Sequence, residues 1–195
     1  MLNMSDRVRQ RDLSYYEWRT DAEGPAMTWG MYAIGHLEGD PTPASLAKAA
    51  ELFNRSFANT RVGPFGVWPE TTKAHALVNF ITGAGGFLQT ALFGYGGLRI
   101  REGRLTLRPR LIEGTTALRL RGLHFRGFVF DVWHGGDATI FTLRGAPSGT
   151  AAPLVVASDQ ALAKPFRLGA SGARAAFSAT GADGAVRGVS FTLHV

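Results

Sequence analysis

The spacing of apolar residues changes at Gly96 and Gly97, and this change limits the possible folds more than any other feature. Before the glycine pair, apolar residues recur every three or four positions, which is typical of helices. After it, they alternate with polar residues, which is typical of strands with one buried face. The sequence therefore predicts an α+β chain, with a helical part at residues 1–96 and an antiparallel β-sandwich at residues 97–195.

Three helices are expected before residue 60, and each has a recognisable start. Ser5 or Asp6 is suited to cap a helix over residues 5–18. Pro25 is suited to be the first residue of a second helix, which runs to about residue 37 and is apolar on almost all sides. Thr42 is a cap residue followed by a proline, so it predicts the start of a third helix.

A carboxylate stands beside an indole just before the last helical segment. Glu70 follows Trp68 and Pro69. Because proline fixes its own backbone and restricts its neighbour, we expect Glu70 on a stiff loop rather than inside a helix. Such a loop is a suitable place from which to aim an acid.

The segment after this loop is apolar and rich in glycine. From Leu77 to about residue 94, the apolar spacing predicts a helix that is buried on most sides. Gly83, Gly85 and Gly86 lie within it, and glycine in a helix interior costs about 0.5–1 kcal/mol relative to alanine. The glycines therefore indicate the close approach of a ligand or of a neighbouring backbone, and the residues alone leave both interpretations open.

The second part of the chain predicts a series of short strands. A turn at residues 101–104 between alternating leucines is a hairpin signature. Further strands are expected at residues 118–121, 125–133, 138–143, 153–158, 166–168, 175–179 and 186–195. Arginines alternate with leucines here, which suits either an anion-binding face or the solvated side of a half-buried sheet. We favour the solvated side, because the alternation alone explains it.

The composition excludes several classes of function. The formal net charge is +6, but the arginines are spread out and no nucleic-acid motif accompanies them, so no nucleic-acid partner is expected. The absence of cysteine excludes disulfides and thiolate metal sites. No apolar run is long enough to span a bilayer, and the polar N-terminus is unlike a signal peptide. A soluble chain without a membrane partner is therefore predicted, and the compartment stays open with the cytoplasm favoured.

Metal, serine-nucleophile and dinucleotide chemistry have no supporting motif. The five histidines are scattered and no pair has the HxxxH spacing. The sequence contains no GxSxG, and the glycines at 94, 96 and 97 follow a helical pattern instead of a strand. No metal and no other cofactor is expected.

Carboxylate chemistry is the remaining candidate. Glycoside hydrolysis needs one acid to protonate the leaving oxygen and a second carboxylate to activate water or attack the sugar. Glu70 beside Trp68 suits one of these roles, because aromatic faces bind sugars and an apolar wall tunes a carboxyl pKa. No second acid has a comparable context. On the residues alone, an ordinary surface glutamate remains the simpler interpretation.

Three ordered stretches resemble one enzyme family. DLSYYEWRTDAEGPAMTW, FNRSFANTRVGPFGVWPE and VNFITGAGGFLQTALFGYGGLRI resemble the C-terminal part of glycoside hydrolase family 65, closest to its branch of protein-glucosylgalactosylhydroxylysine glucosidases and acid trehalases. The similarity covers about residues 5–100. It implies that residues 1–96 are the last helical hairpins of an (α/α)6 catalytic barrel, followed by a C-terminal β-sandwich.

The resemblance also implies roles for individual residues. Glu70 matches the general base that activates water in inverting hydrolysis of an α-linked glucoside, while Trp68, Thr71 and Asn79 would line the substrate site. The general acid has no counterpart here, so the chain looks like a C-terminal fragment that is inactive alone and has the missing N-terminal part as its partner. Asn79 stands where phosphorylases of the family use a histidine for phosphate, which argues against phosphorolysis.

Two alternatives remain open at this stage. The chain is either this hydrolase fragment or a non-catalytic module that binds carbohydrate or a partner domain, with a disaccharide phosphorylase fragment as a third possibility. Because four helices cannot close a six-hairpin barrel, we also expect apolar surface to be exposed near Met27, Met31, Phe53 and Phe87, and the chain to self-associate.

Overall fold

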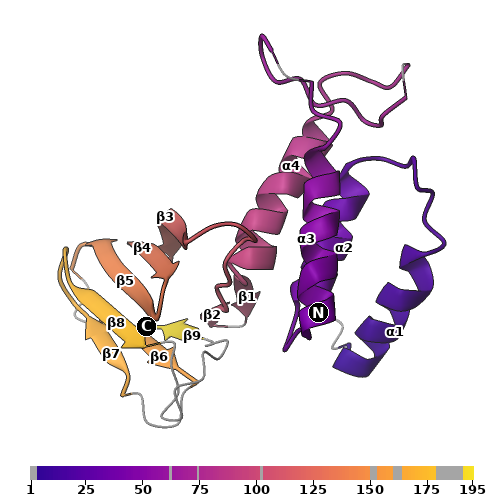
Figure 1. The fold of residues 1–195 in the computed structure, drawn as a ribbon. Helices are drawn as coiled ribbons and strands as arrows, with labels where there is room; N and C mark the ends of the chain where they lie inside the picture. Colours follow the sequence, from indigo (N-terminus) through magenta and orange to yellow (C-terminus); the bar gives the residue numbers. More distant parts are fainter. Residues whose placement is uncertain are drawn as a thin grey trace. The chain divides into compact units, whose positions relative to one another are not determined.

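The computed structural model describes residues 4–61, 63–73, 75–101, 103–149, 153–159, 164–178 and 191–195. The chain divides into two compact units, Met1–Gly94 and Tyr95–Val195. The first unit is helical and the second consists of strands (Figure 1).

The helical unit contains four α-helices. They are α1 (Asp6–Glu17), α2 (Met27–Leu37), α3 (Pro43–Phe57) and α4 (Ile81–Gln89), and α4 continues into a π-helical segment, η1 (Thr90–Tyr95). The caps confirm two of the predicted starts. The Ser5 side chain accepts a hydrogen bond from the amide of Val8, and the Thr42 side chain accepts one from the amide of Ser45.

Two predicted helix starts are wrong. The second helix begins at Met27 instead of Pro25. The glycine-rich helix begins at Ile81 instead of Leu77, because the intervening residues complete the preceding loop. The amide of Glu70 donates to the carbonyl of Leu77 at 2.8 Å, so this backbone oxygen is already occupied outside a helix.

The prediction that the glycine-rich helix is buried on most sides is also wrong. Ile81 is 83% exposed and Leu88 is 65% exposed. The buried face of α4 packs against α3, where the rings of Phe53 and Phe87 stack with centroids 5.2 Å apart. The helix therefore has one packed face and one open apolar face.

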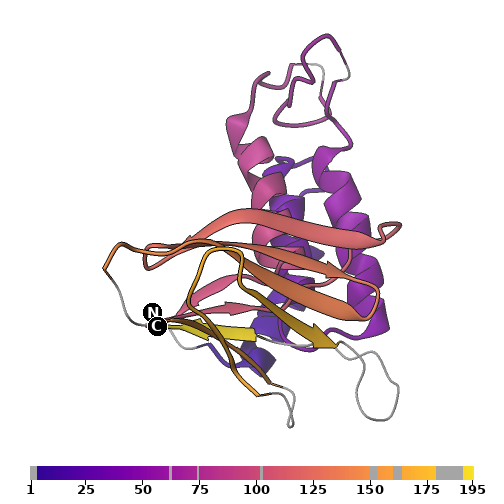
Figure 2. The same ribbon diagram turned by 90° about the vertical axis from the view of Figure 1, so that its left-hand side faces the viewer.

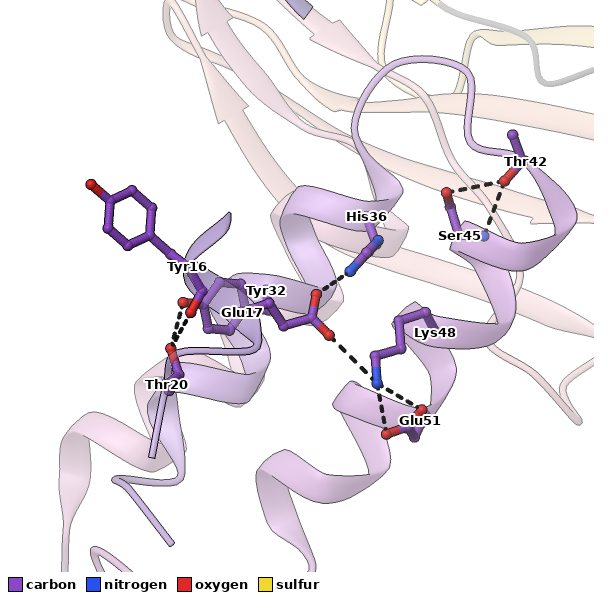
Figure 3. A network of polar contacts seen from close by, with 9 residues as sticks. All are labelled: Tyr16, Glu17, Thr20, Tyr32, His36, Thr42, Ser45, Lys48 and Glu51. Atoms are coloured by element: carbon purple, nitrogen blue, oxygen red, sulfur yellow. Dashed lines mark hydrogen bonds and ion pairs between the residues drawn. The ribbon is translucent and has the colours of Figure 1, made fainter. Parts of the chain in front are cut away.

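A polar network joins α1 to α2 and α3 (Figure 3). The carboxylate of Glu17 lies 2.6 Å from His36 Nε2 and 3.4 Å from Lys48 Nζ. Lys48 also reaches Glu51 at 3.0 Å, and its hydrogen bond with Glu51 is the main cause that raises the pKa of Lys48. Glu17 thus connects the N-terminal helix to both of its neighbours.

The second unit contains two antiparallel sheets. One sheet has the order β1 (Arg99–Arg101), β2 (Arg104–Leu107), β9 (Phe191–His194), β6 (Leu154–Ser158) and β7 (Phe166–Leu168). The other has the order β3 (Ala117–Phe125), β4 (Phe128–Gly135), β5 (Ala138–Gly145) and β8 (Arg174–Ser178). Glu102 of the predicted turn and residues 186–190 of the predicted last strand lie outside the described residues.

Aromatic side chains fill the space between the two sheets. Phe191 of β9 lies 5.0 Å from Phe141 of β5 and 5.0 Å from Phe177 of β8, measured between ring centroids. Phe141 and Phe191 are completely buried. The sheets form two layers around this core (Figure 2), which is the architecture of an antiparallel β-sandwich.

Candidate functional site

The backbone of residues 67–70 is held from several directions. The amide of Phe80 donates to the carbonyl of Trp68 at 2.6 Å, and the side-chain amide of Asn59 donates to the carbonyl of Pro69 at 2.8 Å. Asn59 lies just beyond α3 and Phe80 just before α4. The loop is therefore anchored between two helices, as the proline-based prediction of a stiff loop requires.

Glu70 is fixed at both its amide and its carbonyl. Its amide donates to Leu77 O at 2.8 Å, and its carbonyl accepts from the amide of Ala26 at 2.8 Å. The side chain is half-buried, and among the described residues its carboxylate has no hydrogen bond or ion pair. A carboxylate on a fixed backbone with unoccupied oxygens is available to a substrate or to water.

Trp68 packs into the helical unit. Its ring lies 5.5 Å from the ring of Phe87, and the position that a Cβ on Gly83 would occupy lies only 2.8 Å from Trp68 Cδ1. The indole Nε1 is buried and has no acceptor among the described residues. Gly83 is therefore required by the indole, which supports packing as the reason for this glycine.

The other two glycines of α4 have different surroundings. A Cβ on Gly86 would lie 3.4 Å from the Cα of Met27, so Gly86 also allows two helices to approach closely. Gly85 meets nothing within 4 Å and lies at the border of a pocket of about 530 Å³ between α2 and α4. This pocket is lined by Met27, Thr28, Met31, Tyr32, Thr82, Gly85, Gly86 and Gln89. This pocket was not predicted from the sequence, although the glycine at position 85 was a signal for a close approach there.

Thr71 and Asn79 belong to the same loop as Glu70. Thr71 is half-buried, and its hydroxyl oxygen accepts a hydrogen bond from the amide of Lys73 at 3.2 Å. Asn79 is exposed and has a left-handed backbone with φ of 58°, a conformation that asparagine adopts more readily than most residues. The fold thus brings all four sequence-predicted site residues onto one loop.

The described part of the chain offers no alternative metal or membrane site. Within it, no group of three or more His, Asp and Glu residues is arranged to hold a metal ion. Of the helices in the described ranges, none combines the length and apolar character needed to cross a bilayer.

Comparison with known families bears on the second unit of the chain. Residues 98–158 match the model of the glycosyl hydrolase family 65 C-terminal domain. The chain belongs to glycoside hydrolase family 65. The match lies in the β-sandwich, whereas the three stretches that resemble the family lie mostly in the helical unit.

Curated relatives belong to the same family. The protein-glucosylgalactosylhydroxylysine glucosidase of Dictyostelium discoideum is 45% identical over 149 residues, which is 76% of this chain and 20% of that protein. The acid trehalase of Emericella nidulans is 32% identical over 135 residues, which is 65% of this chain and 12% of the relative. The chain spans about a fifth of the length of the first of these family 65 relatives.

A solved structure has the same fold. A protein described as a putative kojibiose phosphorylase from the human microbiome superposes with a TM-score of 0.59 over 90% of this chain and 22% of its own length. The sequence identity is 16%, so this similarity shows the fold alone.

Proposed function

We propose that this chain carries the general base of an inverting α-glucoside hydrolase and that Glu70 is this base. The observation that carries the proposal is the unoccupied carboxylate of Glu70 on a backbone that is hydrogen-bonded at both its amide and its carbonyl. A general base must hold its oxygens at a fixed position while remaining free to accept a proton from water. The names of the relatives, a glucosidase and an acid trehalase, support a glucoside as substrate.

In this mechanism Glu70 would take a proton from a water molecule that attacks the anomeric carbon. A carboxylic acid on the other side of the sugar ring would protonate the leaving oxygen. No second acid in the sequence has a context comparable to that of Glu70, so we assign the acid to another part of the enzyme. The chain by itself is then inactive, and its partner is the remaining part of the catalytic barrel.

The neighbouring residues would shape the substrate site. Trp68, held by Phe87 and Gly83, would provide an apolar wall, and Thr71 and Asn79 would provide polar groups for hydroxyls of the sugar. The neutral amide of Asn79 supplies no positive charge for phosphate. This favours hydrolysis over phosphorolysis.

A chimera tests the assignment. The corresponding segment of the Dictyostelium discoideum glucosidase is replaced by this chain, and hydrolysis of nitrophenyl α-glucoside and kojibiose is measured. We expect Glu70→Gln to lower kcat by about 10²–10⁴-fold. We expect Glu70→Ala to regain turnover with azide, an anionic nucleophile that needs no base and would attack the anomeric carbon in place of water to give a glucosyl azide. Glu23→Gln is the control, since Glu23 is exposed and paired with Lys73 at 3.4 Å.

Two results would contradict the proposal. A folded chimera whose kcat is unchanged by Glu70→Gln would remove Glu70 as the base. Clear turnover by the isolated chain, lost on Glu70→Gln, would show that the acid lies within these 195 residues.

A further inference from the structure

The outer face of the four-stranded sheet presents an ordered set of side chains. Arg119, Trp133, Ile140 and Ala176 are paired across β3, β4, β5 and β8 and form one row. Side chains alternate along each strand, and the neighbours Val132, Phe141 and Ala175 are completely or almost completely buried in the sandwich. The row of Arg119 and Trp133 therefore faces away from the core.

A second row lies beside the first. Asp131, Thr142 and Arg174 are paired across β4, β5 and β8. Together the rows border a surface pocket of about 500 Å³, lined by Arg119, Asp131, Trp133, Ile140, Thr142, Arg144, Gly172 and Arg174. Trp133 and Ile140 contribute apolar lining, and three arginines contribute positive charge.

The charges in this pocket do not balance. Three guanidinium groups face one carboxylate, that of Asp131. Its Oδ2 accepts from Nε and Nη2 of Arg144 at 2.9 and 2.8 Å, while Oδ1 accepts from the amide of Gly122 at 2.9 Å. Arg119 reaches the same carboxylate only at 4.0 Å. Both carboxylate oxygens of Asp131 are thus already hydrogen-bonded, and Asp131 holds Arg144 in place.

Arg174 is the least satisfied of these groups. Its side chain is exposed, and within the described residues it has no hydrogen bond or ion pair. The local surplus is therefore about two positive charges in a pocket that also contains a partly buried indole. A merely solvated sheet face explains scattered arginines, but it does not explain a tryptophan among them, because contact between apolar aromatic surface and water is unfavourable.

We propose that this face binds an anionic saccharide. The apolar C–H face of a sugar ring would lie on the Trp133 indole, whose π face is electron-rich. Arg119 and Arg174 would hold a carboxylate or sulfate of the sugar, since the planar guanidinium matches such groups with paired hydrogen bonds. Asp131 keeps Arg144 in position beside them.

Calorimetric measurement of tetragalacturonate binding to the full chain tests this site. We expect saturable binding that weakens about tenfold between about 0.02 and 0.2 M NaCl, because the guanidinium groups are exposed to screening. Trp133→Ala and Arg174→Gln are each expected to weaken binding at least about tenfold, as loss of an anchoring contact of about 1.4 kcal/mol. Maltotetraose, which carries no charge, is expected to bind far more weakly.

Matched variants separate the pocket from general charge. Arg167→Gln removes an exposed arginine of β7 in the other sheet, and Trp18→Ala removes a tryptophan that is 71% exposed after α1. Both are expected to leave tetragalacturonate binding unchanged. Because the Arg174 side chain is exposed, Arg174→Gln remains informative even if Trp133→Ala fails to fold.

Several results would overturn the inference. They are the absence of saturable binding, equal binding of maltotetraose, and binding that Trp133→Ala and Arg174→Gln leave unchanged. Equal competition by inorganic sulfate would show that charge alone is recognised and would also overturn it. The inference goes beyond the proposed hydrolase, since Glu70→Gln is expected not to alter this binding and the two proposals fail separately.

Discussion

The amide of Ala26 donates to the carbonyl of Glu70 at 2.8 Å, which connects the start of α2 to the loop of the candidate base. Ala26 caps α2 and has no side-chain oxygen to satisfy the first-turn amides. The carbonyl of Glu70 instead supplies the acceptor for the amide of the cap residue itself. The position of the carboxylate and the start of this helix therefore depend on each other.

We expect Gly83→Ala to destabilise the helical unit. The new Cβ would lie 2.8 Å from Trp68 Cδ1 and 2.9 Å from Nε1, and the rigid indole is already held against Phe87. Overpacking of this kind costs about 1–3 kcal/mol. Urea unfolding monitored by circular dichroism measures the loss of stability, and tryptophan fluorescence reports the displacement of the Trp68 ring.

Gly85→Ala is the matched control on the same helix. Its Cβ would meet nothing within 4 Å, so alanine should stabilise α4 by about 0.5–1 kcal/mol through its higher helix propensity. Equal effects of the two substitutions would show that Trp68 does not determine the need for glycine at position 83.

Helix starts that depend on neighbouring residues could be predicted from the sequence, whereas those that depend on distant contacts could not. Ser5 and Thr42 each accept a hydrogen bond from an amide three residues later, so their role is visible locally. The predicted start of α4 is too early for this reason. The carbonyl of Leu77 accepts from the amide of Glu70, seven residues earlier, and the amide of Phe80 donates to the carbonyl of Trp68, twelve residues earlier. The spacing of apolar residues along the sequence does not reveal such hydrogen bonds.

The same distinction applies to the two candidate sites. Glu70 was identifiable because Trp68 and Pro69 are adjacent in sequence. The pocket around Trp133 was not, because Arg119, Asp131 and Arg174 come from three strands that only the sheet register brings together. The alternating arginines were assigned to the solvated side of a sheet, and their arrangement around one indole became visible only in the fold.

We expect Asp131→Asn to lower the free energy of unfolding by about 1.5–3 kcal/mol at neutral pH, the usual value of hydrogen bonds to a charged group. The hydrogen bond from the Gly122 amide, followed by Arg144, holds the pKa of Asp131 below its ordinary value of 3.8. A lowered pKa means that the stabilisation is complete above pH 3.8 and is lost as the pH falls through the folded-state pKa. The difference between wild type and variant should therefore shrink in acid.

Chemical denaturation at several pH values measures this difference. Asp137→Asn is the control, since Asp137 is exposed beyond β4 and should change stability by less than about 0.5 kcal/mol. A gap between wild type and Asp131→Asn that stays constant from pH 7 into strong acid would contradict the role assigned to the ionised carboxylate.

His134 gives a second pH dependence, at a higher pH. Its Nδ1 lies 2.8 Å from the hydroxyl of buried Thr139, and burial, followed by the charge of Arg110, lowers the pKa of His134 below 6.5. The folded state then resists protonation, so stability is complete above pH 6.5 and falls as the pH drops toward the folded-state pKa. The loss is at most about 1.4 kcal/mol for each unit of pKa lowering.

NMR titration of the imidazole and denaturation between pH 5 and 8 check this expectation. His134→Gln should remove the step in stability, whereas His75→Gln, at an exposed loop position, should leave it in place. An imidazole that titrates at or above pH 6.5 in the folded chain would be inconsistent with burial as the dominant cause.

The open face of α4 should make the chain self-associate. Ile81 and Leu88 are seven residues apart, two turns of helix, so they lie on the same face, and they are 83% and 65% exposed. Met31, which is 42% exposed on α2, borders the neighbouring apolar pocket. Exposed apolar surface of this kind is usually covered by another chain or domain.

We expect Leu88→Lys with Ile81→Lys to shift the chain toward monomer in sedimentation velocity, while Leu46→Lys on α3, 39% exposed, has a smaller effect. A wild-type chain that sediments as a monomer at all concentrations would contradict this prediction and would show that the four helices are sufficient as a closed unit.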